Sequence, residues 1–237
     1  MLRFAKNTRD SSESGHVQFL SQSFTIFWKD VLIEYRTKDA LTSMLMFGLL
    51  VILMFHFAFE PDGQETERFG PGLLWMTFIF AGILGLNRSF AGERENDSLQ
   101  GLLMAPTDWG TIFLGKMLAN LVFMLIADGV ILLCFALFFN FDLLPRIGWL
   151  SLITLLGTLA FVSVGTILSA IAMNTRMSEV MLPVLLIPVV LPAVVGAVES
   201  TAAVFTDPPG EALGFWLRFL VVYNVIFVTL PFLLFDF

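Results

Sequence analysis

The segment Gly110–Lys116 is the first place in this sequence where residue types and spacing suggest chemistry. Its glycines and lysine have the spacing of a phosphate-binding P-loop, but Met117 stands where that loop needs a Ser or Thr to ligate magnesium. A P-loop also follows a β-strand, whereas this segment leads into a long apolar stretch. Nucleotide binding by this chain is therefore not predicted.

Metal-ligating and nucleophilic residues are few. His16 and His56 cannot form a multi-histidine metal site, and the single cysteine, Cys134, cannot build a disulfide, a CxxC site or a zinc finger within the chain. His56 lies near the end of an apolar stretch, so we expect it to face headgroups or a neighbouring helix, with axial ligation of a haem as the alternative. We predict no catalytic residue, no metal site and no enzymatic activity in this chain.

Asp128 is the strongest single candidate for a functional residue, because it lies in the middle of an apolar stretch. A carboxylate at mid-membrane costs several kcal/mol unless it is paired, protonated or hydrated. It lies either on a substrate path or subunit seam, or in a hydrogen bond that locks two helices together. Lys116, in the same stretch, is close enough to its end to extend toward the headgroups.

The composition shows which elements must position these residues. Hydrophobic residues make up 57% of the 237 positions and charged residues 14%, whereas soluble domains carry roughly a quarter charged residues. A net charge of -7 argues against nucleic-acid binding, which needs a basic surface. The apolar stretches predict an all-α, polytopic membrane protein with six transmembrane helices, at 41–59, 70–86, 112–139, 147–173, 180–198 and 219–235.

The distribution of basic residues predicts the orientation. Ten of the 13 Lys and Arg residues flank the spans on the side that holds the N-terminus. By the positive-inside rule, both termini then face the cytoplasm. The tryptophans near the starts of spans are expected to lie in the aromatic belt at the membrane surface: Trp75, Trp109, Trp149 and Trp216.

Residues 22–40 predict an amphipathic helix before the first span. One side is apolar, at Phe24, Phe27, Trp28, Val31, Leu32 and Tyr35, and the other is charged, at Lys29, Asp30, Glu34 and Arg36. Such a helix lies on the cytoplasmic surface of the membrane, or docks on another subunit, and the two arrangements are compatible.

The connection 87–110 between spans two and three predicts a short helix. Asp97 and Gln100 have the spacing of a capping box, and Pro106 would end the helix. Its leucines, including Leu102 and Leu103, form an apolar face, which favours a surface for a cytoplasmic partner over a solvated turn. In span five, Pro183, Pro188 and Pro192 favour a bend, and we expect residues 199–214 not to continue a regular helix.

Several motifs together resemble those of a known family. The chain is similar to ABC-2-type exporter permeases and, more narrowly, to the CcmB family of haem exporter permease subunits in cytochrome c maturation. The resemblance covers nearly everything from Phe24 onward. It rests on 28–30, 34–36, 71–75, 85–88, 93–97, 102–108, 114–116 and 182–188.

The resemblance implies how such a chain is driven. A separate cytoplasmic ABC ATPase, present in two copies, would act on two copies of the permease, together with other cytochrome c maturation membrane subunits and a haem chaperone in the bacterial inner membrane. ATP-driven closure would pass through Glu93, Arg94, Glu95, Asp97, Leu102 and Leu103, and through the helix at 22–40.

The implied function is to couple ATP hydrolysis to haem export or to release of the haem-loaded chaperone. Haem is then a substrate in the complex, and no covalently bound cofactor is expected. The alternatives are an ABC-2-type exporter of lipid, glycan or drug, and a non-transporting membrane scaffold. The resulting domain organisation is a polar extension at 1–21, the amphipathic helix at 22–40 and a six-span permease domain at 41–237.

Overall fold

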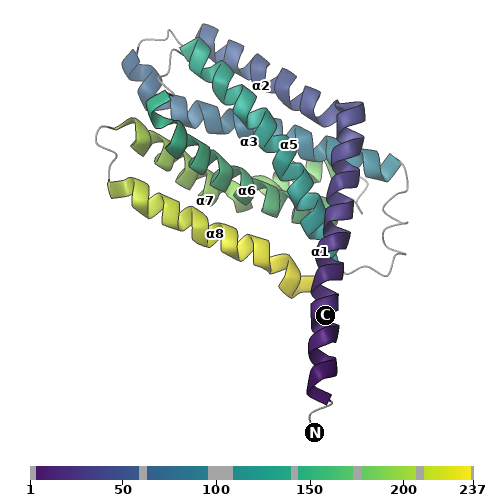
Figure 1. Cartoon of the computed structure of the whole chain (residues 1–237). Helices are drawn as coiled ribbons and strands as arrows, with labels where there is room; N and C mark the ends of the chain where they lie inside the picture. The colour runs from purple at the N-terminus through teal and green to yellow at the C-terminus, as the bar shows by residue number, and fades with distance from the viewer. Residues whose placement is uncertain are drawn as a thin grey trace.

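The computed structural model describes residues 4–58, 63–95, 109–139, 144–172, 178–206 and 211–235, and this part of the chain is all helical. Its elements are α1 (Phe4–Thr37), α2 (Asp39–Ala58), α3 (Gly63–Glu95), α5 (Trp109–Phe139), the short 3-10 helix η1 (Leu144–Arg146), α6 (Ile147–Ala172), α7 (Ser178–Phe205) and α8 (Glu211–Phe235). Figure 1 shows α2 to α8 running side by side, with α1 crossing one end of the bundle.

Within the described part of the chain, six helices are long and apolar enough to cross a membrane, which confirms the predicted number of spans. These spans are Asp39–Ala58, Arg68–Ser89, Trp109–Phe139, Leu144–Ala172, Val180–Phe205 and Ala212–Leu233. They agree with the apolar stretches of the sequence because a run of about 20 apolar residues matches the hydrocarbon thickness of a bilayer.

Helices α3 and α6 form the centre of the bundle. Helix α6 packs against α5, α7 and α8, while α3 packs against α2, α5 and α7. The buried side of α6 is rich in small and hydroxyl residues, including Gly157, Thr158, Ser163, Gly165 and Thr166. Such residues let helix backbones approach closely in a membrane, where packing rather than the hydrophobic effect holds helices together.

The sequence prediction for residues 199–214 was wrong at both ends of that range. Residues 199–214 were expected not to continue a helix, but α7 runs on to Phe205 and α8 begins at Glu211. The three prolines Pro183, Pro188 and Pro192 also lie inside α7. The continuation is held by buried side chains such as Ala203 and Val204, so tertiary packing outweighs the polar residues at 199–201.

The junction between α1 and α2 is a tight break at Lys38. This residue has φ 58°, in the left-handed region that often ends a helix. Its N–H donates to the carbonyl of Glu34 at 2.7 Å, and its own carbonyl accepts from the Thr42 N–H at 2.9 Å. The chain therefore turns from α1 directly into α2, and α1 lies across the start of α5; this end of the bundle is called the α1 end below.

Candidate functional site

Helix α1 contacts the bundle through a close approach to α5. Ser23 and Ile26 of α1 are buried, and the Ser23 hydroxyl donates to the carbonyl of Thr111 at 3.3 Å. A Cβ at Gly115 of α5 would lie 2.8 Å from the Ser23 carbonyl oxygen and 2.9 Å from Ile26. The two helices reach this distance because position 115 has no side chain.

An ion cluster joins the same two helices just beyond Gly115. The Lys116 Nζ lies 3.5 Å from Asp30 Oδ2, and the Lys29 Nζ lies 3.2 Å from Asp30 Oδ1. Lys116 is only 6% exposed, so the sequence expectation that it extends to the headgroups was wrong. A nearly buried ammonium needs a close anionic partner, and α1 provides it.

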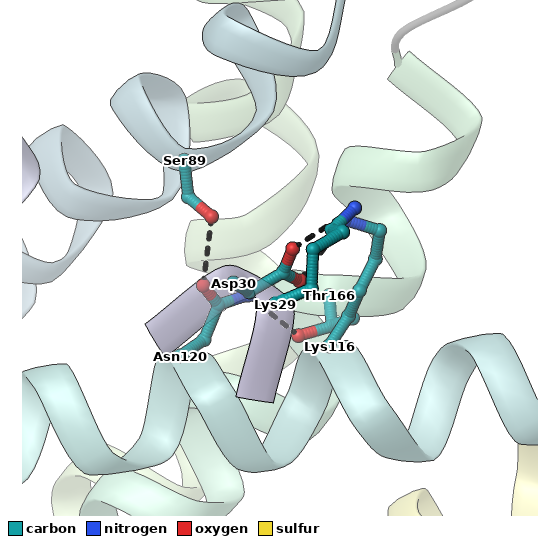
Figure 2. A network of polar contacts seen from close by, with 6 residues as sticks. All are labelled: Lys29, Asp30, Ser89, Lys116, Asn120 and Thr166. Atoms are coloured by element: carbon teal, nitrogen blue, oxygen red, sulfur yellow. Dashed lines mark hydrogen bonds and ion pairs between the residues drawn. The ribbon is translucent and has the colours of Figure 1, made fainter. Parts of the chain in front are cut away.

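A separate pair of hydrogen bonds joins α5 to α3 and α6 one turn further along α5. The Ser89 hydroxyl of α3 donates to Asn120 Oδ1 of α5 at 2.9 Å, and Asn120 Nδ2 donates to Thr166 Oγ1 of α6 at 3.5 Å. Figure 2 shows these side chains gathered where α1 crosses α5. Four helices thus meet through polar groups at the α1 end, which makes it the best-defined candidate site.

The other predicted residues of α1 have separate positions. Trp28 and Arg36 are exposed, and Trp28 stacks on Phe24 with ring centroids 6.3 Å apart. The aromatic side of α1 therefore faces away from α5, while Asp30 faces toward it. Trp28 and Arg36 are not part of the ion cluster.

Glu34 instead binds the start of α2. Its Oε1 accepts the Leu41 N–H at 2.8 Å, so it serves as a capping group for the next helix. Burial raises the pKa of the Glu34 carboxyl above its ordinary value of 4.5, and the charge of Asp39 raises it further. The N–H groups of Leu41 and Ala40 oppose that shift because they stabilise the carboxylate.

Of the six predicted coupling residues, three lie in α3 and three fall outside the described part of the chain. Glu93, Arg94 and Glu95 lie in the last turn of α3, which extends past the span that ends at Ser89. Asp97, Leu102 and Leu103, with the predicted short helix and its capping box, lie outside the described residues. The role of all six stays a prediction.

Asp128 of α5 is only 3% exposed, and its side chain faces α6 inside the bundle. The Thr158 hydroxyl donates to its Oδ2 at 2.7 Å. A small pocket of about 10 Å³, room for roughly one water molecule, lies beside this pair and is also lined by Met124, Trp75 and Phe161. The predicted helix–helix hydrogen bond is therefore present, and the pocket is too small for a haem.

Trp75 is not a belt residue as the sequence suggested. It is 3% exposed and donates its Nε1–H to Thr201 Oγ1 of α7 at 2.9 Å. Its ring lies over Gly157 of α6, where any Cβ would overlap it. Trp75 and Gly82 lie two turns apart on the side of α3 that packs inward, where Phe161 of α6 lies against Gly82.

Asn120, Thr158 and Thr166 are the site residues that sequence reasoning missed. Each is a neutral polar residue in a long apolar helix, a common feature of membrane proteins. One sequence pattern did indicate Asn120. Lys116, Asn120 and Asp128 are separated by four and eight positions, which places them on one face of α5. His56, by contrast, packs edge-on against Phe138 and Phe139 of α5, in line with the expectation of a neighbouring helix.

Comparison with known proteins places the chain beside one group of membrane proteins. A family model described as "CcmB protein" matches residues 21–234. "Heme exporter protein B" of Escherichia coli (strain K12) is 26% identical over 99 residues, covering 40% of this chain and 45% of that protein. The protein of the same name from Rhodobacter capsulatus is 30% identical over 133 residues, covering 55% and 59%. Each match spans less than two thirds of the relative.

Proposed function

The chain belongs to the CcmB protein family, and we propose on this basis that it is the membrane permease subunit of an ATP-driven haem exporter for cytochrome c maturation. The curated relatives carry the name "Heme exporter protein B", which supports haem as the substrate. The chain itself carries no P-loop with a magnesium ligand, so the ATPase activity belongs to a partner chain.

The observation that supports an ATP-driven movement of this chain is the attachment of α1 to α5. Helix α1 crosses the end of the bundle and holds a nearly buried lysine of α5 through Asp30. A force applied to α1 would therefore act directly on α5, and through Asn120 on α3 and α6. We infer that α1 lies on the cytoplasmic membrane surface, with its aromatic side toward lipid and its polar side toward the bundle.

The proposed partner is a cytoplasmic ABC ATPase in two copies, acting on two copies of this chain together with other cytochrome c maturation membrane subunits and a haem chaperone. Glu93, Arg94 and Glu95 extend from α3 beyond its span, toward the side where this ATPase would bind. Asp97, Leu102 and Leu103 would complete that contact. The output is either haem export or release of the haem-loaded chaperone on the outer side.

The pocket beside Asp128 restricts how haem could pass. It has room for roughly one water molecule, so passage through a single copy would require α5 and α6 to separate. A path along the surface between two copies, or release of the chaperone by a conformational change, requires no such opening. The proposed function includes both the path between two copies and the release of the chaperone.

The first test is genetic complementation. A strain lacking this chain is expected to lose its c-type cytochromes, as measured by haem staining, and the wild-type chain should restore them. Arg94→Ala and Glu95→Ala should leave the complex assembled but fail to restore cytochromes, because the ATPase contact is weakened. Gln22→Ala, on the exposed side of α1, is the matched control and should complement fully.

The outcomes separate the alternatives. Normal cytochrome c levels in the deletion strain would contradict the proposal and favour an exporter of lipid, glycan or drug. Full complementation by Arg94→Ala and Glu95→Ala together would favour a scaffold that transmits no ATP-driven motion.

A further inference from the structure

Three buried polar residues of α5 lie on one face of the helix. Lys116, Asn120 and Asp128 are separated by four and eight positions, with Met124 between them, and all four side chains are buried. Positions four apart lie above one another on a helix. From Lys116 to Asp128 this face, called the α5 polar stripe below, is about 18 Å long.

The stripe begins at the α1 end and ends at mid-membrane. Its first member is held by Asp30 of α1, its second by Ser89 and Thr166, and its last by Thr158. Figure 2 shows the first two members, Lys116 and Asn120, side by side on α5. Each polar group therefore has partners on a different helix, α1, α3 or α6.

Two further polar features of the bundle could accommodate water molecules. Ser169 of α6, one turn from Thr166 toward the α1 end, is 2% exposed and its Oγ has no hydrogen-bond partner among the described residues. At the other end, the pocket lined by Asp128, Met124 and Thr158 has room for roughly one water molecule. Polar groups at both ends could thus bind water with little rearrangement.

Among the described residues, no second ionisable group lines the pocket beside Asp128. Among the described residues that line its pocket, the others are apolar or carry a hydroxyl or indole, and Asp128 alone is ionisable. The next charged group along the stripe is Lys116, more than three turns away and paired with Asp30. A proton that reaches this pocket would therefore bind to the Asp128 carboxylate.

We propose that Asp128 is a proton-binding site reached by water from the α1 end along the α5 polar stripe. The carboxylate accepts a proton from hydronium, which leaves a neutral carboxylic acid and a water molecule. In the conformation described here the stripe is closed, so access requires α5 to move relative to α3 and α6. The inference goes beyond the proposed function and is independent of the cargo.

The route is tested by cysteine labelling of the full-length chain in membrane vesicles of both orientations. All variants carry Cys134→Ser, which removes the native thiol. The single substitutions Asn120→Cys and Met124→Cys then measure the access of water to the stripe. Ile126→Cys, on the exposed side of α5, is the control. Only a thiolate in contact with water reacts with a membrane-impermeant cationic thiosulfonate. We expect labelling at 120 and 124 at least tenfold faster than at 126, and faster from the α1 end.

The outcomes are distinct, and Asp128 remains intact in these variants. Labelling at 124 no faster than at 126, or faster from the opposite side, would overturn the route. Failure of the proposed haem function would leave this result unaffected, because the assay measures water access alone.

Protonation is tested by infrared spectroscopy of the same protein. A carbonyl-stretch band of a protonated carboxylic acid that titrates with bulk pH, shifts in D₂O and is lost in Asp128→Asn is the expected result. An Asp128 band that neither titrates nor shifts in D₂O would show a sealed helix–helix hydrogen bond and would overturn the proposal. Glu199→Gln, at an exposed position of α7, is the control and should leave the band unchanged.

Discussion

At the residue scale, Asp30 and Lys116 differ in how much they depend on each other. Asp30 also lies 3.2 Å from the partly exposed Lys29, whereas Lys116 is almost out of contact with water. Removing a partner from a buried charge is costly because the charge stays desolvated. Loss of the carboxylate should therefore matter more than loss of the lysine.

We predict that Asp30→Asn lowers the free energy of unfolding by roughly 2–3 kcal/mol, somewhat less than the loss for a fully buried pair. Lys116→Met should cost less, because Asp30 keeps Lys29 as its partner. The double variant should be more stable than Asp30→Asn alone, since it leaves no desolvated cation. Thermal unfolding in detergent measures all three, and equal effects of the two single variants would argue against this account of the cluster.

Glu34 makes the junction of α1 and α2 sensitive to pH. Its pKa is raised in the folded chain, so the folded chain binds this proton more tightly than the unfolded chain does. Its contribution to stability is thus present below pH 4.5 and is lost as the pH rises through the raised pKa.

Glu34→Gln should remove that pH dependence, because the amide oxygen still accepts the Leu41 N–H but does not ionise. The melting temperature of the wild type should fall relative to that of Glu34→Gln as the pH rises above 4.5 and through the raised pKa. Glu34→Ala, which lacks the cap, should be less stable than Glu34→Gln throughout, by roughly 1 kcal/mol. Parallel pH profiles for wild type and Glu34→Gln would be inconsistent with the raised pKa.

At the scale of elements, the packing of α1 on α5 depends on Gly115. A Cβ there would meet the backbone of α1 at Ser23, and a backbone atom cannot rotate away as a flexible side chain can. Gly129 on the same helix provides a matched control, because a Cβ at that position meets nothing within 4 Å.

Gly115→Ala should displace α1 and cost roughly 1–3 kcal/mol in stability, while Gly129→Ala should be neutral or slightly stabilising through its higher helix propensity. Melting temperatures of the two variants in the same detergent give the comparison. If both behaved alike, the close approach of α1 to α5 would not be a stabilising contact.

The helices were more predictable from the sequence than their partners. The six spans follow from the length of uninterrupted apolar stretches, which depends on local composition alone. The Asp30–Lys116 pair joins positions far apart in the sequence, and no local pattern records which face of α1 meets α5. Trp75 was misplaced for the same reason, since its burial depends on Gly157 of another helix.

At the scale of the whole molecule, the six candidate spans of the described residues predict that both termini lie on one side of the membrane. The basic residues predict that this side is the cytoplasm. A fluorescent protein fused after Phe237 should fluoresce, and alkaline phosphatase at the same position should be inactive. Active phosphatase at this fusion point would reverse the orientation and place α1 on the outer surface.

The central claim is that a separate ATPase drives haem handling through this chain. The direct measurement is haem transfer to an outer-side acceptor by the complete complex reconstituted in vesicles, followed by absorption of the haem-loaded acceptor. The account predicts that transfer requires ATP and this chain, and that Asp30→Asn slows it while ATP is still hydrolysed by the assembled complex. Transfer at the same rate without this chain, or without ATP, would contradict the account.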